Sequence, residues 1–223
     1  MFIASVTVSP WAANCYLAGA DGGGECVIID PGITGAELIV GAVERSGRTP
    51  VAILGTHGHL DHVGDAAVLA DRYRVPVYLH PADQHLLTHP ADGLGPAAVP
   101  LLMQLLGTAT LPAPHTVRDF ADGEEVSLAG IAFLPLLAPG HTAGSTLLTC
   151  PAEDAVFTGD VVFAGSVGRV DLPGGSARDM KRTIETVLPG LPRHARLYPG
   201  HGGATTMAHE WSTNPYLQPD IWK

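Results

Sequence analysis

The segment Thr56-His57-Gly58-His59-Leu60-Asp61-His62 decides what this chain is. It follows the apolar run Val51–Leu54, which predicts a buried strand that delivers this loop. Its three imidazoles and one carboxylate are ligands that zinc and similar divalent metals prefer. The first two histidines would point to one side of the strand end, and the last two ligands to another. These are too many ligands for one tetrahedral ion that keeps an open position, so the segment predicts two metal ions side by side.

Three further segments place histidine or aspartate after a strand-like apolar run: Pro139-Gly140-His141-Thr142, Thr158-Gly159-Asp160 and Pro199-Gly200-His201-Gly202. A nearby glycine in each lets the backbone turn sharply. Loops at the ends of rigid strands commonly carry chemistry. The four segments together supply seven candidate metal ligands: His57, His59, Asp61, His62, His141, Asp160 and His201.

In this order the four segments resemble the metallo-β-lactamase superfamily of metallohydrolases. The resemblance extends over nearly the whole chain, from Asn14-Cys15-Tyr16 and Ile29-Asp30-Pro31-Gly32 onward. Gly168-Arg169-Val170-Asp171, Pro173-Gly174-Gly175 and Asn214-Pro215 resemble the short, single-domain glyoxalase II-like hydrolases in particular. The patterning of the chain indicates only an α/β or α+β fold, and the resemblance adds the four-layer αβ/βα sandwich.

The resemblance also implies how the ligands divide. One metal would be held by His57, His59 and His141. The second would be held by Asp61, His62 and His201, with Asp160 bridging both. Two divalent ions, expected to be zinc with iron or manganese as alternatives, would share a hydroxide that acts as the nucleophile. Asp61, which would orient the hydroxide, and Asp160 are the expected catalytic residues.

Two other residues have alternative roles that the sequence leaves open. Asp30 would either hold a ligand histidine from behind or form the turn at Pro31-Gly32. Arg169 would either bind the anionic end of the substrate, as in glyoxalase II-like proteins, or pair with Asp171. His80, at a strand end, is expected to be structural.

The expected function is hydrolysis of a thioester, S-lactoylglutathione or the ester of another small thiol. One alternative is a persulfide dioxygenase, which shares the fold but uses one iron held by two histidines and one aspartate. A lactonase would apply the same hydroxide to a cyclic ester. A scaffold without activity has no need of seven ligands, so an enzyme is expected.

The composition limits which partners and which cell compartment are expected. The 223 residues favour one domain, residues 1–223, and 46% hydrophobic residues with 15% charged ones indicate a folded globule. The net charge is −10 and the 12 basic residues form no stripe, so nucleic acid is not an expected partner. No apolar run approaches the roughly 18 residues of a membrane span, and no signal peptide is evident. We therefore expect a cytoplasmic enzyme with a small-molecule substrate.

Hydrophobic periodicity predicts the elements in outline. Strands are expected at residues 2–8, 14–19, 25–30, 51–54, 75–79, 117 onward, 126–128, 131–137, 146–149, 155–158 and 196–198. Helices are expected at residues 36–45 and 177–188, and another after a cap at Asp61 or Asp65. The proline-rich stretch 81–115 would pack on the core rather than cover the mouth of the site. Cys15, Cys26 and Cys150 are expected to be free, buried thiols.

Overall fold

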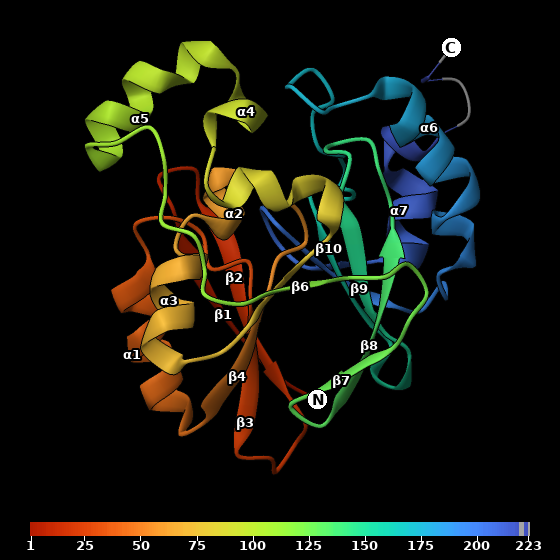
Figure 1. The fold of residues 1–223 in the computed structure, drawn as a ribbon. Coiled ribbons are helices and arrows are strands. Elements are labelled where there is room, and N and C mark those ends of the chain that lie inside the picture. Colours follow the sequence, from red (N-terminus) through yellow and green to blue (C-terminus); the bar gives the residue numbers. More distant parts are fainter. Residues whose placement is uncertain (219–220, 223) are drawn as a thin grey trace.

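Two mixed six-stranded sheets form the centre of the computed structural model, which describes residues 1–218 and 221–222. The sheets pack face to face, with α1 and α3 on one outer face and α6 and α7 on the other (Figure 1). This is the four-layer αβ/βα sandwich that the resemblance implied. The predicted domain, residues 1–223, includes 219–220 and 223, which lie outside the described residues.

The first sheet has the strand order β1-β2-β3-β4-β5-β6. Its strands are Phe2–Val8, Ala13–Gly19, Glu25–Ile29, Thr49–Leu54, Val77–Leu79 and Val117–Asp119. The first three form the predicted antiparallel meander, whereas β3 to β6 pair in parallel. Parallel neighbours need long connections, and α1 (Ala36–Ser46) and α3 (Ala66–Tyr73) provide two of them.

The second sheet has the order β12-β11-β10-β9-β8-β7. Its strands are Val126–Leu128, Ile131–Leu137, Thr146–Cys150, Ala155–Gly159, Arg196–Pro199 and Thr205–Thr206, numbered β7 to β12. Only β10 and β11 are parallel, and α6 (Ala177–Thr186) lies in the connection between them. The sequence did not predict β12 or α7 (Met207–Thr213), since two and seven residues are too short for a clear periodicity.

The remaining helical segments lie mainly between β4 and β6. They are α2 (Leu60–Val63), η1 (Pro81–Leu87), α4 (Ala91–Leu94), η2 (Pro96–Ala98), α5 (Val99–Leu106), η3 (Pro151–Glu153), η4 (Leu188–Gly190) and η5 (Pro215–Leu217). Among the described residues, no helix combines the length and apolar character needed to cross a membrane.

Alternation of side chains along the strands creates the layers. Leu17 of β2 and Ile28 of β3 pack in the apolar cluster beneath α1 and α3. Their neighbours Ala18 and Ile29 point the other way, into the cluster between the two sheets. Side chains of one strand alternate with a period of two, so each central strand contributes to two apolar layers at once. Burying one such large side chain contributes roughly 1.5–3 kcal/mol.

Two expectations about connections differ from the structure. Neither Asp61 nor Asp65 caps the following helix with its side chain. The Asp65 carboxylate instead accepts hydrogen bonds from the backbone N–H groups of Gly35 (2.7 Å) and Ala36 (2.8 Å) at the start of α1. Asp65 therefore satisfies free backbone donors at the N-terminus of α1. Sequence spacing does not reveal this pairing, because the residues are about 30 positions apart.

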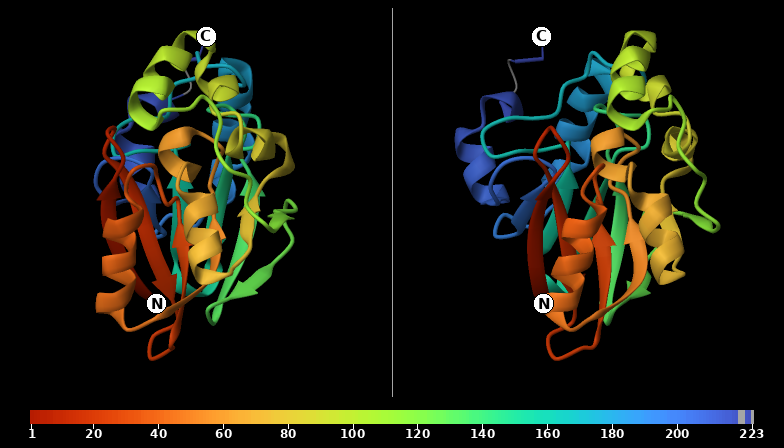
Figure 2. Two further views of the ribbon diagram at one scale, coloured as in Figure 1. Left: turned by 60° about the vertical axis from the view of Figure 1, so that its left-hand side comes forward. Right: turned by 90° about the vertical axis from the view of Figure 1, so that its left-hand side faces the viewer.

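The stretch 81–115 both packs on the core and reaches the mouth of the site. Leu102 of α5 is fully buried and packs with Ile33 and Leu60. Its neighbour Leu101 is 45% exposed and lines the pocket described below. Both further views show α4 and α5, drawn in yellow-green, above one edge of the sheets (Figure 2). The expectation of packing alone was incomplete, because adjacent residues of one helix serve the two roles.

The cysteines provide a test of the fold. Cys15, Cys26 and Cys150 are free and buried. In the pairing of β2 with β3, Tyr16 lies opposite Ile29. Cys15 and Cys26 are therefore not opposite each other, and the strand register keeps the two thiols apart. Burial raises the pKa of Cys26 to about 11 and that of Cys150 to about 12.

The thiolate is the reactive form, so at pH 8 we expect almost no reaction of the native protein with a chromogenic disulfide reagent. Under non-reducing denaturing conditions all three thiols should react within minutes. A count of one thiol after denaturation would show a disulfide and contradict the strand register.

Candidate metal centre

All seven predicted ligands meet at one edge of the sandwich. The first four follow the end of β4 in the first sheet. The other three lie in the loop between β8 and β9, at the end of β10 and just after β11, all in the second sheet. The strands β10 and β11 are parallel, so their carboxyl ends reach the same edge. The site is thus built from both sheets.

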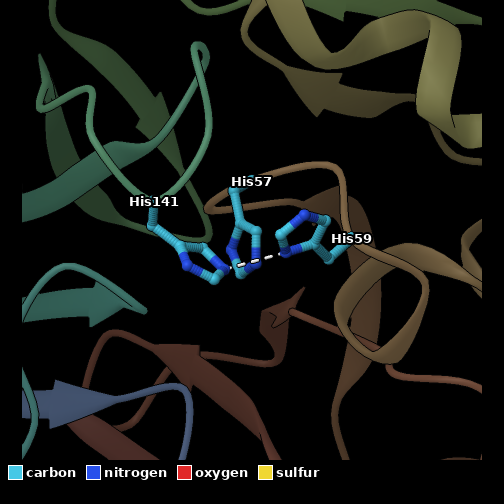
Figure 3. A group of neighbouring side chains, drawn as sticks. All are labelled: His57, His59 and His141. Atoms are coloured by element: carbon cyan, nitrogen blue, oxygen red, sulfur yellow. Dashed lines mark hydrogen bonds between the residues drawn. The ribbon is translucent and has the colours of Figure 1, made fainter. Parts of the chain in front are cut away.

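The first group of ligands is His57, His59 and His141 (Figure 3). Nδ1 of His59 lies 2.8 Å from Nε2 of His141. The other nitrogen of His141, Nδ1, donates to the backbone carbonyl of Arg169 at 2.7 Å, so Nε2 of the neutral ring carries the lone pair. One ligand atom from each histidine lies within 4.8 Å of the others, which is compact enough for one ion.

The second group is Asp61, His62 and His201. Nε2 of His201 lies 3.3 Å from Oδ2 of Asp61 and 3.3 Å from Nε2 of His62. Asp160 connects the two groups, because Oδ1 lies 3.4 Å from Nε2 of His62 and Oδ2 lies 3.5 Å from Nε2 of His141. Its carboxylate therefore lies between the two groups, and the bridging role that the resemblance implied stays a prediction.

Electrostatics of the site hold His57 and His59 neutral but favour the charged form of His62. Burial lowers the pKa of His57 well below its usual value and that of His59 to about 3. Burial opposes a charge on His62 as well, but Asp160 and Asp61 outweigh it and raise its pKa to about 10. Burial also opposes ionisation of Asp61, yet His62 and His201 hold its pKa below the ordinary range. The carboxylates thus require nearby positive charge, which a divalent ion supplies better than one proton.

Unpaired buried atoms show that the residues fit a metal. The fully buried side-chain atoms without a hydrogen-bond partner in the described part of the chain are Nε2 of His57, Nε2 of His59 and Oδ1 of Asp160. Buried polar atoms are nearly always paired. Nε2 of His57 and Oδ1 of Asp160 belong to the ligand groups, so their lack of a partner calls for a ligand, whereas His59 faces His141 with its other nitrogen, Nδ1. Imidazole nitrogens and carboxylate oxygens are suited to zinc or iron.

Asp30 holds the second group from behind. Its carboxylate accepts hydrogen bonds from the backbone N–H of Thr56 (2.7 Å), the Thr56 hydroxyl (2.7 Å) and Nδ1 of His62 (3.0 Å). Because Nδ1 of His62 donates to Asp30, Nε2 is the nitrogen left for a metal. This is the first of the two roles that the sequence left open for Asp30.

The loop of His201 is tied to β2. The Asn14 side chain donates to the carbonyls of Pro199 (3.0 Å) and Gly202 (2.8 Å), and the Tyr16 hydroxyl donates to the carbonyl of Pro199 (2.7 Å). The segment Asn14-Cys15-Tyr16, which the sequence offered only as part of a resemblance, therefore fixes a ligand loop of the opposite sheet.

A pocket of about 420 Å³ opens above the ligands. Its walls are mostly apolar and include Trp11, Leu94, Leu101, Phe163 and Leu172. None of these five was predicted as a site residue, since they lie on separate loops and short helices and share no spacing. Their common position depends on the fold alone.

Arg169 contributes a charge to the pocket wall. Its Nε and Nη2 each lie 2.7 Å from an oxygen of Asp171, which forms a two-bond ion pair. The side chains of Arg169 and Asp171 are 60% and 65% exposed, so solvent screens this pair. The structure thus shows the ion pair, one of the two predicted roles, at a place where substrate can also reach the guanidinium.

Relatives over the full length support the same kind of site. An uncharacterized protein of Mycobacterium tuberculosis is 38% identical over 98% of each chain. A protein of Bacillus subtilis named as a metallo-hydrolase is 34% identical over 94% of each chain. The hydroxyacylglutathione hydrolase GloC of Haemophilus influenzae is 33% identical and covers 97% of this chain and 98% of its own.

Solved structures agree with these relatives. The BLEG-1 B3 metallo-beta-lactamase superposes with a TM-score of 0.84 at 32% identity, covering 97% of this chain and 100% of that one. TTHA1623, solved in a di-iron-bound form, gives a TM-score of 0.78 at 37% identity, covering 95% and 98%. The family model for the metallo-beta-lactamase superfamily matches residues 8–201. With its layers, ligand order and buried His and Asp clusters, the chain belongs to the metallo-beta-lactamase superfamily of metal-dependent hydrolases.

Proposed function

We propose that this chain is a dinuclear, glyoxalase II-like thioester hydrolase that acts on S-lactoylglutathione or the ester of another small thiol. The observation that carries this proposal is the pair of ligand groups joined by Asp160 at the floor of the pocket. The thioester class is supported by the full-length similarity to the hydroxyacylglutathione hydrolase of Haemophilus influenzae.

In this proposal each ligand takes the role that the resemblance implied. His57, His59 and His141 would hold one ion, and Asp61, His62 and His201 the other. When bound, two divalent ions supply a water-derived nucleophile at neutral pH and polarise the substrate carbonyl. Zinc is the proposed metal. Iron stays an alternative because TTHA1623 was solved with two irons, and manganese because it accepts the same ligand types.

The two acidic ligands would also act on the reacting groups. Asp160, close to ligands of both groups, would fix the separation of the ions. Asp61 lines the pocket with a side chain that is 18% exposed, so its carboxylate can orient an attacking water molecule. The apolar walls above them would exclude bulk water and strengthen these electrostatic contacts.

The pocket and the charge of the chain favour a small-molecule substrate. A volume of about 420 Å³ lies in the usual range for small ligands. The net charge of −10 disfavours binding to nucleic acid phosphates. Three unpaired, buried thiols agree with the reducing cytoplasm, which we propose as the compartment.

An oxygenase with one iron is the main alternative. ETHE1 from Myxococcus xanthus shares the fold with a TM-score of 0.74 at 26% identity, covering 96% of this chain and 84% of that one. Oxygen uptake with a persulfide of glutathione would identify this activity. Release of free thiol from a panel of thioesters, with a lactone and a β-lactam for comparison, tests the hydrolase.

Metal stoichiometry is the first prediction. Protein stripped with a chelator and titrated with Zn²⁺ should take up two ions per chain, because seven ligands in two groups exceed the needs of one ion. Calorimetry with elemental analysis of the dialysed protein gives the count. Saturation at one ion would reject the dinuclear proposal and favour the oxygenase.

Removing one ligand from each group should damage different metal positions. His59→Ala should leave one ion bound by the second group, and Asp61→Ala one ion bound by the first. Both should lower kcat/KM for a thioester by orders of magnitude while the circular dichroism spectrum stays unchanged, since neither side chain belongs to an apolar cluster of the core.

His115→Ala is the matched control, because this imidazole is 87% exposed and distant in sequence from the ligand loops. It should retain two ions and full turnover. Near-normal turnover in either ligand variant would contradict the assignment of that residue.

Arg169→Ala tests the proposed contact with an anionic substrate. A guanidinium–carboxylate contact made equally in the ground and transition states affects KM rather than kcat. We expect KM for a glutathione thioester to rise about tenfold, the equivalent of one charged hydrogen bond. A small uncharged thioester should be nearly unaffected, and so should both substrates in the exposed control Arg178→Ala. Equal losses on both substrates together with a lower Tm would show that Arg169 only braces its loop through Asp171.

A further inference from the structure

Asp83 is a buried carboxylate outside the predicted ligand set. It lies in η1 and is 2% exposed. Its Oδ2 accepts hydrogen bonds from the backbone N–H of Gly58 (2.8 Å) and the hydroxyl of Thr142 (2.7 Å). Its Oδ1 accepts from the backbone N–H of Gly144 (2.8 Å). Both oxygens are therefore used as acceptors by neutral donors.

These donors belong to the two loops that carry the first ligand group. Gly58 lies between His57 and His59, after β4 of the first sheet, and Thr142 directly follows His141 in the second sheet. One carboxylate thus joins the loop of two ligands to the loop of the third. The backbone N–H of Thr146 also donates to the carbonyl of Thr56 at 2.8 Å, which ties the same loops at their base. Asp83 adds the connection next to the imidazoles.

Close approach of Asp83 accounts for two glycines in the ligand loops. A Cβ atom at Gly58 would lie 2.8 Å from the backbone oxygen of Asp83 and 2.9 Å from its Cβ. A Cβ atom at Gly144 would lie 2.6 Å from Cγ of Asp83. Real Cβ contacts are longer than 3.0 Å, so only glycine lets both N–H groups reach the carboxylate.

The charge of Asp83 has no direct counterion. Among the described residues, no Lys, Arg or His nitrogen lies within 4.0 Å of its carboxylate, although 13 ion pairs are present elsewhere. A buried charge without a partner is costly unless hydrogen bonds and a nearby cation offset it. The three hydrogen bonds offset part of the cost of burying this charge, and a cation at the adjacent ligands would offset the rest.

We propose that Asp83 is a positioning residue that sets the spacing of His57 and His59 relative to His141 and thereby the affinity of the first metal position. This inference rests on the proposed function, since it requires that the three histidines hold an ion. Asp83 is not among the residues that line the pocket, and the hydrogen bonds of its carboxylate in the described part of the chain go to Gly58, Thr142 and Gly144 rather than to a ligand side chain. It acts through the backbone of the two loops, which fixes the 2.8 Å approach of His59 Nδ1 to His141 Nε2.

The variant Asp83→Asn separates this role from simple filling of space. Asparagine has the same size, but either orientation of its amide turns an NH₂ group toward the N–H of Gly58 or of Gly144. One loop therefore loses its acceptor. Thr142→Val removes the hydroxyl contact with Asp83, together with the 2.8 Å contact of the same hydroxyl with Ser145, and should give a smaller effect of the same kind. Asp92→Asn, an exposed aspartate on the neighbouring α4, is the matched control.

The experiment is calorimetric titration of the chelator-stripped, full-length protein with Zn²⁺. Asp83→Asn should weaken one of the two ions about 10- to 100-fold, the usual effect of losing a partner behind the ligands, and leave the other within about twofold. In a His201→Ala background, which keeps the first group, Asp83→Asn should still weaken the remaining ion. In a His59→Ala background it should not change the affinity of the ion held by the second group.

Unchanged affinity of both ions in Asp83→Asn would overturn the inference. Equal weakening of both ions together with a lower Tm of the metal-free protein would also overturn it, because that pattern indicates general damage to the fold. If Asp83→Asn fails to fold, Thr142→Val decides the question by the same criteria. Binding of a single ion by the unaltered protein would instead reject the proposed dinuclear function. The unaltered protein is therefore titrated before the variants.

Discussion

Packing of the two sheets against each other is the constraint on which the site depends. Four ligands follow a strand of the first sheet and three follow strands of the second. The two groups therefore meet only while the sheets keep their relative position. Tyr16 shows how the interface enforces this. Its ring contacts those of Phe157 (5.4 Å between centroids) and Tyr198 (5.7 Å), while its hydroxyl binds the carbonyl of Pro199 beside His201. The same side chain, Tyr16, thus packs in the apolar interface between the sheets and holds the loop that carries His201.

Burial of so many polar groups has a consequence for stability. The imidazoles and carboxylates of the site include buried atoms without partners, so the ligand loops gain from a bound cation what their own hydrogen bonds do not provide. Two aspartates outside the seven predicted ligands organise these loops. Asp30 accepts a hydrogen bond from His62, and both residues follow strands of the first sheet. Asp83 instead joins a loop of the first sheet to a loop of the second. A rigid arrangement of ligands before binding reduces the free energy spent on ordering them.

The metal ligands fix the type of chemistry, but the pocket walls select the substrate. The walls come from loops and short helices that share no motif, and their residues are apolar except near Arg169 and the ligands. Similar chains with this fold include a hydroxyacylglutathione hydrolase and a B3 metallo-beta-lactamase, which act on different substrates by their names. One fold can serve several substrates when the loops around a common arrangement of sheets differ.

The sequence by itself determined the ligand types, their order along the chain and most of the regular elements. This was possible because ligand spacing in His57–His62 and the alternation of strands such as β1 are local properties. It missed β12 and α7, which are too short for periodicity, and the partners of Asp65 and Asp83. Only the tertiary structure decided which ring nitrogen faces the site, which residues form the pocket and which carboxylates support the ligands. Those features depend on contacts between residues distant in sequence, which exist only after the sheets have packed.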